Sequence, residues 1–371
     1  MKIVLVTWLS TGNYGTGLQS YALHKKLQEM GYDVCILPFF ALSDFTLTAK
    51  IKKVVRYYPK YYAKLFLKRL FFENKSQRKL REFNNSNYNI RLIKTQAQYE
   101  ELLKESDVFI AGSDQIWNCY HSFNPFYFLS FAGDKKRIAY ASSIGTSDFP
   151  EEKKDQIKYL LSKFSHIGVR EETAVKAVKD LICEVDVRQV ADPTFLLDDK
   201  HWRNFACKAT LEFDLPEKYI LCYFVSNESY TIEQLETIKQ KLGISNVIVI
   251  PAKENEKISI PETFIYPDAG PHEFVYILSH ATCVCTDSFH ATTISINMQK
   301  DFIEFKRFKD ENRQSQNSRI YDLLEHYNLT ARLYDSQEAS LYNPINYTEI
   351  TDIVERDRKD CIAYLQNSIT G

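Results

Sequence analysis

Short apolar segments alternate with amphipathic stretches along most of the chain, and this alternation constrains the fold more than any other feature. The apolar run KIVLVTW at 2–8 leads into the glycine-rich STGNYGTG and then into LQSYALHKKLQEM, an amphipathic stretch closed by Gly31. This order predicts a strand, a tight turn and a helix. Further short strands are predicted at 33–37, 107–112, 137–142 and 166–170. Strands that alternate with helices favour a parallel sheet in an α/β fold.

The same pattern begins again after a polar segment at 198–216. Strands are predicted at 219–225, 246–250 and 282–286, and helices through 233–242, from Pro271 and from about Phe289. A chain of 371 residues is also longer than one hydrophobic core usually organises. We therefore expect two Rossmann-like domains with parallel sheets facing a cleft, at 1–200 and 217–345. The last residues, 346–371, are expected to form a C-terminal helix that packs back on the first domain.

Polar residues follow several of the predicted strands directly. Ligands of open parallel sheets bind outside the carboxyl ends of the strands, so these residues are candidates for a binding site. The candidates that the pattern alone provides are Gly12, Asn13, Tyr14, Gly15, Gly112, Ser113, Asp114, Gln115, Arg170, Asp287, Ser288 and His290. Trp117 lies just beyond Asp114 and either stacks on a ligand or fills the core.

Composition and cysteine spacing argue against several other classes of protein. With 44% apolar and 26% charged residues, the chain has the composition of a globular protein. No apolar run reaches the roughly 18 residues that a spanning helix needs. The N-terminus lacks a small-residue cleavage site and is interpreted as a strand, so we expect a cytoplasmic protein. The eight cysteines form no C-x-x-C pair and no zinc-like pairing with histidine, which favours reduced thiols and no metal site.

The glycine-rich turn after the first strand differs from a dinucleotide-binding turn. Its spacing is G-x-x-G-x-G at 12–17, whereas the dinucleotide fingerprint is G-x-G-x-x-G. The second predicted strand ends in CILPFF, without the acidic residue that would bind a ribose. The sequence therefore does not favour NAD or a related cofactor.

A strongly basic segment interrupts an otherwise balanced chain. Between Lys50 and Arg81 there are twelve Lys or Arg and one acidic residue, Glu73, so this segment carries +11 and the remainder −12 for a total of −1. Apolar residues recur at steps of three and four, which predicts a basic amphipathic helical insertion at about 49–83, interrupted near Pro59. Such a helix suits peripheral contact with an anionic membrane.

The alternative is that the aromatic residues of 49–83 pack on the first domain and its lysines only face solvent. Nucleic acid is a weaker third partner, because no recognition motif accompanies the charge.

Six motifs together resemble the polysaccharide pyruvyl transferase family. They are NYGTGLQSYAL near the start, GSDQIWN at 112–118, GVREETA at 168–174, ADPTFLL at 191–197, TDSFHATTISI at 286–296 and NSRIYDLL at 317–324. Their order and spacing cover nearly the whole chain. The resemblance implies a glycosyltransferase-B-like pair of Rossmann-type domains. It also implies transfer of a pyruvyl group from phosphoenolpyruvate, as donor substrate and without a cofactor, to a sugar or a lipid-linked oligosaccharide, usually as a ketal.

Ketal formation needs a proton donor, a base and a clamp for the anionic donor. The resemblance implies that His290 is the acid and that Arg170 binds the donor's phosphate or carboxylate. Asp114 is the candidate base, with a helix cap as its alternative. Further donor-binding candidates are Ser288, Asn317, Ser318 and Arg319. The cleft and acceptor candidates are Gly12, Asn13, Tyr14, Gly15, Gly112, Ser113, Gln115, Trp117 and Asp287.

The arginine candidates also have structural interpretations. Arg170 could form an ion pair with Glu171 or Glu172, and Arg319 could be a solvated helix-end residue. The sequence departs from the family at Ser288, where many members carry arginine, and at Ala291, where they carry glycine. Other cations must therefore hold the phosphate if the donor is the same.

Two other function classes share the expected architecture. A nucleotide-sugar glycosyltransferase of the B type would have the same two domains, because fold alone does not determine function. A non-catalytic relative that only binds a glycan is the second alternative, since Ser288 and Ala291 depart from the family pattern.

Overall fold

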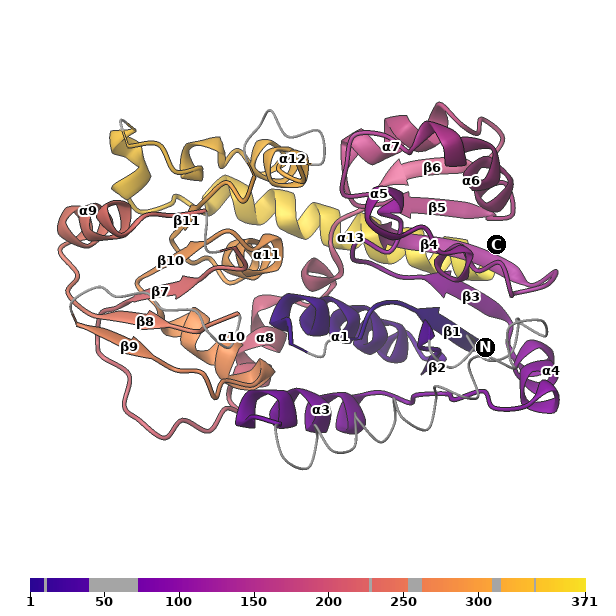
Figure 1. The fold of residues 1–371 in the computed structure, drawn as a ribbon, viewed down its shortest axis with the longest axis horizontal. Helices are drawn as coiled ribbons and strands as arrows, with labels where there is room; N and C mark the ends of the chain where they lie inside the picture. The colour runs from indigo at the N-terminus through magenta and orange to yellow at the C-terminus, as the bar shows by residue number, and fades with distance from the viewer. Residues whose placement is uncertain (10–11, 40–72, 227–228, 253–261, 309–314, 337) are drawn as a thin grey trace.

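Two parallel β-sheets form the framework of the molecule. The computed structural model describes residues 1–9, 12–39, 73–226, 229–252, 262–308, 315–336 and 338–371. The first sheet has the order β2-β1-β3-β4-β5-β6 and the second β11-β10-β7-β8-β9, and every strand pair is parallel (Figure 1). Two α/β domains with parallel sheets are thus confirmed.

The strands are short and lie close to the predicted positions. Those of the first sheet are β1 Lys2–Val6, β2 Asp33–Ile36, β3 Val108–Ala111, β4 Lys136–Ser142, β5 His166–Val169 and β6 Asp186–Gln189. Those of the second are β7 Ile220–Tyr223, β8 Val247–Val249, β9 Thr263–Ile265, β10 Cys283–Thr286 and β11 Phe302–Glu304. The sequence did not predict β6, β9 and β11. β9 and β11 have three residues each, and only Val187 of β6 is fully buried, so none carries a long apolar run.

Helices connect the strands of each sheet and flank both sheets. In the first half they are α1 Tyr14–Glu29, α3 Lys75–Asn87, α4 Gln96–Glu105, α5 Cys119–Ser122, α6 Lys154–Leu161 and α7 Glu172–Lys179. In the second half they are α8 Asp199–Ala206, α9 Ile232–Leu242, α10 Pro271–His280, α11 Phe289–Asn297, α12 Ser318–His326 and α13 Thr348–Thr370. Short 3₁₀ turns are η2 Pro125–Phe128, η3 Glu151–Lys153, η4 Pro193–Leu196, η5 Thr330–Arg332 and η6 Ala339–Tyr342.

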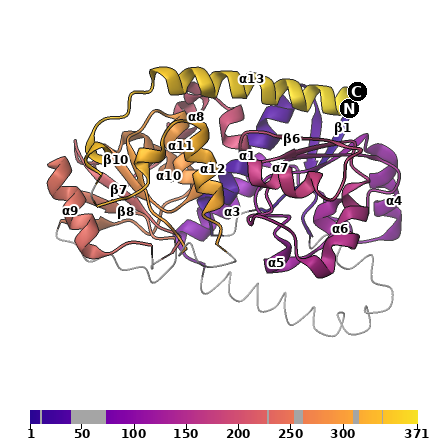
Figure 2. The same ribbon diagram turned by 90° about the horizontal axis from the view of Figure 1, so that it is seen from above.

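The C-terminal helix α13 runs along both domains (Figure 2). Near its end, the Tyr364 hydroxyl donates to the carbonyl of Ala139 in β4 at 3.0 Å. Near its middle, Arg358 donates to the Phe195 carbonyl at 2.8 Å and to the Asn297 side chain at 2.9 Å. Helix α13 therefore follows the second domain in the sequence but contacts the first sheet as well.

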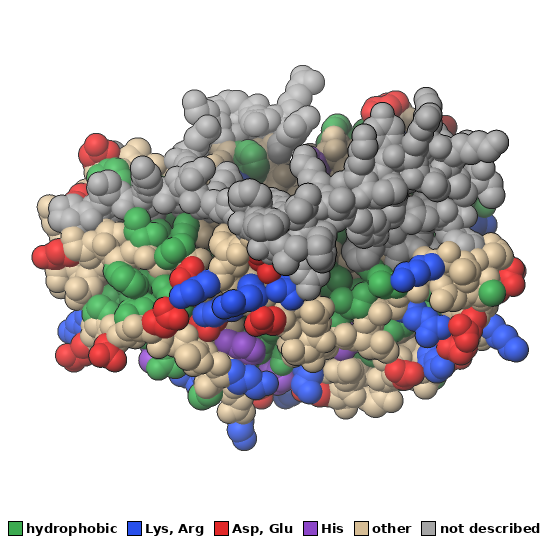
Figure 3. Space-filling view, turned by 60° about the horizontal axis from the view of Figure 1, so that its bottom comes forward, with side chains coloured by type: hydrophobic (Ala, Val, Ile, Leu, Met, Phe, Trp, Pro, Cys, Tyr) green, Lys and Arg blue, Asp and Glu red, His purple; other side chains and the backbone are tan. Residues whose placement is uncertain are grey.

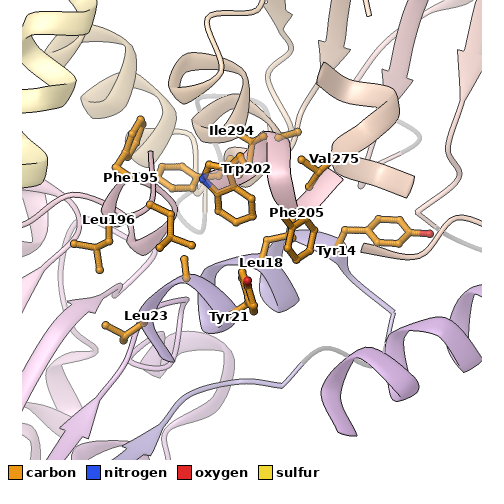
Figure 4. Close-up of a cluster of buried hydrophobic side chains, with 14 of the residues drawn as sticks. Tyr14, Leu18, Tyr21, Leu23, Phe195, Leu196, Trp202, Phe205, Val275 and Ile294 are labelled. Atoms are coloured by element: carbon orange, nitrogen blue, oxygen red, sulfur yellow. The ribbon is translucent and has the colours of Figure 1, made fainter. Parts of the chain in front are cut away.

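One hydrophobic core continues from the first domain into the second. Figure 4 shows Tyr14, Leu18 and Tyr21 of α1 close to Trp202 and Phe205 of α8, with further apolar side chains from η4, α10 and α11 around them. Trp202 is fully buried, and its ring lies 6.2 Å from that of Tyr21. Because the same apolar cluster contains side chains from both domains, its burial stabilises their relative position.

The described end of the basic segment is α3, whereas 40–72 lies outside the described residues. Lys79 of α3 pairs with Glu273 of α10 at 2.9 Å, and Lys75 pairs with Glu212 at 3.2 Å. Phe83, on the same helix, packs on Tyr21 with ring centroids 5.5 Å apart. Figure 3 shows basic and acidic side chains next to each other on the face where α3 lies. The cations of α3 are thus partly balanced by carboxylates of the second half.

The eight cysteines are free thiols, as predicted. Cys119, Cys222, Cys283, Cys285 and Cys361 are buried. No group of His, Cys, Asp or Glu suitable for a metal ion occurs in the described part of the chain, and none of its helices is long and apolar enough to cross a membrane.

Candidate functional site

The N-termini of two helices, one from each domain, meet at His290. Asn13 caps α1 by accepting from the Thr16 amide at 3.3 Å, and Ser288 caps α11 by accepting from the Ala291 amide at 3.5 Å. A Cβ atom on Gly15 would lie 2.6 Å from Nδ1 of His290, so only glycine allows this approach. Helix N-termini carry partial positive charge and exposed amide donors, and their convergence favours an anion.

His290 lies between a cation and a carboxylate of the first domain. Its Nε2 atom is 3.4 Å from Nη1 of Arg170 and 3.5 Å from Oδ2 of Asp192. A neutral Nε2 can accept from the guanidinium, and a protonated Nε2 can donate to the carboxylate. The imidazole therefore has a partner in either protonation state, which is what a group that gives and takes a proton requires. His290 is 6% exposed.

Arg170 follows β5 and is held by two carboxylates. Its Nε donates to Glu171 and its Nη1 to Asp192, both at 3.1 Å, and its guanidinium lies 4.1 Å from the centre of the Phe289 ring. Burial lowers its pKa, but Glu171, Asp192 and Asp114 outweigh burial, so the pKa is raised. Its Nη2 is buried and has no hydrogen-bond partner among the described residues. The predicted ion pair with Glu171 is therefore present, and one donor is left for a ligand.

Asp192 is a site residue that the sequence did not reveal. It follows β6, which was not predicted, and it is 2% exposed. Burial would raise its pKa, but His290 and Arg170 outweigh burial, so the pKa is lowered and the carboxylate stays ionised. Its Oδ1 accepts from the amide and the hydroxyl of Thr194 at 3.0 and 2.9 Å, which fixes the orientation. The signal available was its place in the motif ADPTFLL at 191–197.

Arg319, at the start of α12, lies on the same aromatic ring as Arg170. Its guanidinium is 5.6 Å from the centre of the Phe289 ring. Neutral groups hold it. Its Nε donates to the Gln316 carbonyl at 3.2 Å, and the Gln115 side-chain oxygen, in the amide orientation that satisfies both residues, accepts from its Nη1 at 2.8 Å. Burial, then Arg170 and Arg307, lower its pKa to about 9. The charge of Arg319 is therefore poorly compensated within the protein.

A buried glutamate lies next to this cluster. Burial raises the pKa of Glu304 well above its ordinary value, which favours the protonated carboxyl. It is fully buried and bonded to the Thr292 hydroxyl of α11. The sequence did not identify Glu304, because it ends the short strand β11.

Asp114, the predicted base, lies in a strained loop near the two arginines. Its φ of 73° is in the left-handed region, which non-glycine residues rarely adopt. Its Oδ2 accepts from the Thr16 hydroxyl at 2.7 Å and its Oδ1 from the Gln115 amide at 2.9 Å. Both oxygens thus have partners within the chain, and the carboxylate contributes negative charge beside Arg170 and Arg319.

A second strained residue lies in the adjacent strand. Ala141 has a φ of 55°, where the pairing register between β4 and β5 shifts. Two residues later, the Ser143 hydroxyl donates to Glu171 at 2.6 Å. The bulge thus directs a serine toward the carboxylate that holds Arg170.

Two aromatic residues predicted for the cleft lie in the core instead. Trp117 is fully buried, stacks on Phe128 with centroids 5.1 Å apart, and donates from its ring nitrogen to the Tyr127 carbonyl. Tyr14 is 2% exposed and stacks on Phe274 of the second domain at 4.9 Å. For Trp117 the core alternative is confirmed, and the prediction that Tyr14 lines the cleft is corrected, because neither ring has a free face for a sugar.

Several other candidates support the backbone around the site. Both oxygens of Asp287 accept backbone amides, from Val225 at 2.6 Å and Ser226 at 2.9 Å. The Asn317 side chain bonds both backbone groups of Phe308, at 3.2 and 2.6 Å.

The small candidates are placed differently. Gly112 and Ser113 are buried under β1, Gly12 is exposed, and Ser318 begins α12 half-buried. The structure therefore brings His290, Arg170, Arg319, Gly15 and Asp114 together more closely than the rest.

Comparison with known proteins agrees with this geometry. A model of the family described as polysaccharide pyruvyl transferase matches residues 13–305. A search of curated protein sequences gave no match.

Among solved structures, the UDP-GlcNAc 2-epimerase from Neisseria meningitidis bound to UDP-GlcNAc has 9% identity and a TM-score of 0.53, covering 99% of this chain and 100% of that one. The UDP-GlcNAc 2-epimerase from Methanocaldococcus jannaschii has 12% identity and a TM-score of 0.50, covering 99% and 100%. At these identities the likeness concerns the fold alone. The shared fold is the glycosyltransferase-B-like arrangement of two domains. The family match spans both domains and includes His290, Arg170 and Asp192, and the chain therefore belongs to the polysaccharide pyruvyl transferase family.

Proposed function

We propose that the chain transfers a pyruvyl group from phosphoenolpyruvate to two hydroxyls of one sugar, in a surface polysaccharide or its lipid-linked precursor. The family match gives the class of reaction, and one geometric observation supports the donor. His290 lies between Arg170 and Asp192, at the point where two helix N-termini meet. That arrangement combines an acid–base group with a site that favours a small, highly charged anion.

The donor's anionic groups would be bound by groups already oriented for them. Among the described residues, Nη2 of Arg170 has no hydrogen-bond partner and no carboxylate contacts the guanidinium of Arg319, so both cations are offered to the donor. Guanidinium groups bind carboxylate and phosphate in a planar, paired geometry. These two cations take the place of the family arginine that Ser288 replaces.

The reaction then needs one proton at carbon and two carbon–oxygen bonds. His290 gives its proton to the methylene carbon of phosphoenolpyruvate, and a sugar hydroxyl attacks the adjacent carbon. The second hydroxyl displaces phosphate from that carbon and closes the ketal. One hydroxyl proton restores His290 and the other leaves with phosphate. Asp192 keeps the imidazole oriented throughout, and no oxidant or cofactor takes part.

Donor preference and phosphate release test the proposal. Phosphoenolpyruvate should raise the melting temperature of the protein more than a panel of UDP-sugars at the same concentration. Phosphate should be released only when an acceptor glycan is present. Protection by a UDP-sugar without protection by phosphoenolpyruvate would reject the proposed donor.

The fold favours one second candidate. The Neisseria meningitidis and Methanocaldococcus jannaschii structures, which contain UDP-GlcNAc, share this two-domain arrangement, so a nucleotide-sugar transferase is the alternative. A non-catalytic glycan-binding protein is the third possibility, and it would bind the glycan without releasing phosphate.

We further propose that residues 49–83 attach the protein to the inner face of an anionic membrane, where a lipid-linked acceptor is made. The support is the basic amphipathic pattern, most of which falls on 40–72, outside the described residues. The pairing of α3 cations with Glu273 and Glu212 favours the packing alternative for the described part. Co-sedimentation with anionic liposomes at low salt would support attachment, and its absence would reject it.

A further inference from the structure

A cavity of about 150 Å³ adjoins Arg170 and lies between β6, α12 and α13. Its inner end is lined by Arg170, Asp192 and Phe289, each at most 4% exposed. Its outer end is lined by His326 of α12 and Asp360 of α13, which are both exposed. The cavity therefore leads from solvent to the carboxylate that contacts His290. The lining combines Gln189 and Asp192 of the first domain with Asp322 and His326 of α12, so the cavity is shared between the two domains.

The outer part of this cavity has the opposite charge to the helix N-termini at Gly15. Asp322, Asp357 and Asp360 line it, and Nε2 of His326 lies 2.5 Å from Asp357. The two guanidinium groups of the lining, Arg170 and Arg319, are buried and belong to its inner end. A carboxylate-rich entrance repels a multiply charged anion such as phosphoenolpyruvate. A neutral molecule with many hydroxyls is not repelled, and its hydroxyls can donate to carboxylates.

The size and the apolar walls favour a ring. A cavity of this volume is large enough for a six-membered ring. Phe195, Phe289 and Tyr327 contribute aromatic carbon to the lining, and the rest is mostly polar. At the inner end, the buried carboxylate of Asp192 can accept a hydrogen bond from a ligand hydroxyl, while the guanidinium of Arg170 beside it is assigned to the donor.

We propose that this cavity binds one neutral sugar ring and is the acceptor subsite. Only the role of the ring as the acceptor rests on the proposed function, whereas binding of a sugar ring in the cavity does not depend on it. Asp192 lines the cavity and lies 3.5 Å from His290, so a hydroxyl bound to it is next to the reacting carbon. The two substrates then approach from different sides, the anionic donor at the helix N-termini and the acceptor through the carboxylate-lined cavity.

A filled cavity tests this directly. Leu323 of α12 is half-buried and lines the cavity, so Leu323→Trp should occupy it. Glu325 lies on the same helix, is exposed and does not line the cavity, so Glu325→Trp is the matched control. The probes are methyl glycosides of hexoses and N-acetylhexosamines, with binding measured by saturation-transfer NMR. We expect binding to the wild type, at least a tenfold loss in Leu323→Trp, and no change in the control.

A second pair of variants perturbs the fold less than a tryptophan does, and it tests the same cavity. Asp360→Asn removes one carboxylate at the mouth of the cavity, and Asp352→Asn removes one from an exposed position on the same helix outside the cavity. The first should raise the acceptor KM about threefold to tenfold, the magnitude of a lost hydrogen bond to a charged group. The second should leave it unchanged, and the KM for phosphoenolpyruvate should be unchanged in both.

The outcomes separate this proposal from the proposed function. Glycoside binding that Leu323→Trp abolishes supports the cavity even if phosphoenolpyruvate is never turned over. If Leu323→Trp and Asp360→Asn transfer pyruvyl groups with an unchanged acceptor KM, the cavity is not the acceptor subsite, and the proposed function still holds. Failure of every glycoside to bind wild type, or binding of spermidine in their place, overturns the proposal as well.

Discussion

Arg170 and Arg319 lie on the same Phe289 ring but are held in different ways. Arg170 comes from the first domain, and Glu171 and Asp192 pair with it at 3.1 Å each. Arg319 comes from the second domain and is held by the neutral groups of Gln115 and Gln316. Among the described residues, carboxylates therefore compensate the charge of Arg170, whereas only neutral groups contact the charge of Arg319. Arg170 serves both fold and binding, whereas Arg319 is expected to serve binding alone.

The largest expected effect is at the imidazole between the two domains. His290→Ala should lower turnover by about 10²- to 10⁴-fold, the contribution of a general acid. His290→Gln keeps a hydrogen-bonding group beside Asp192 but cannot transfer a proton, so it should lose nearly as much. Phosphate release with a sugar acceptor measures both. A variant that retains more than half the wild-type rate would show that the two cations act without an acid here.

The second test compares the two arginines. Arg170→Met leaves Glu171 and Asp192 as buried, unpaired charges and should cost about 3–5 kcal/mol of stability, as for other broken buried pairs. Arg319→Met removes an uncompensated charge and should leave stability unchanged or higher. Both should raise the KM for phosphoenolpyruvate. Urea denaturation and donor kinetics measure the two properties, and equal destabilisation by both variants would contradict the contrast.

The third test concerns the approach of the domains at Gly15. Gly15→Ala places a methyl group against His290 and should displace the ring, with a loss of turnover of about 10²-fold for a shift near 1 Å. Gly12→Ala is the control, because a Cβ there meets nothing within 4 Å. Circular dichroism should show both variants folded. Equal activity in the two variants would mean that His290 need not keep this position.

The smallest expected effect concerns pH. It separates the pH dependence of the unfolding free energy from the pH dependence of turnover. His24 of α1 is 1% exposed, and burial lowers its pKa to about 4. Below its ordinary pKa of 6.5 the unfolded chain takes up a proton that the folded chain does not, so stability falls as pH falls toward 4. Between pH 7 and 6 the loss should be on the order of 1 kcal/mol.

His24→Leu should flatten this dependence in urea denaturation measured at several pH values. The pH profile of turnover should keep its shape in this variant, since His24 lies outside the site. An unchanged stability slope would assign the acid sensitivity to other groups.

The sequence was sufficient for the fold but only for part of the site. Continuous apolar runs such as KIVLVTW predict buried strands because both faces of a parallel sheet are covered. The residues that follow those strands, Arg170 and Asp114 among them, were predicted for the same reason. β6 and β11 carry no long apolar run, so Asp192, which follows β6, and Glu304, which ends β11, were missed.

Contacts between distant segments could not be predicted from local patterns. Asp192 and His290 are far apart in the sequence and meet because the η4 turn that Asp192 caps packs on α11. Trp117 illustrates a second limit of local patterns. The sequence does not distinguish an aromatic residue that packs in the core near a strand end from one that stacks on a bound sugar. Its burial against Phe128 depends on the η2 turn, which no periodicity indicates.

The core shared by the two domains has a consequence for unfolding. Side chains of α1 and of α8, α10 and α11 belong to one apolar cluster, and α13 contacts β4 of the first sheet and α11 of the second domain. Neither half could lose its structure without exposing apolar surface of the other. Calorimetry should therefore record one cooperative heat-absorption peak with matching calorimetric and van't Hoff enthalpies, although chains of this length usually melt in steps.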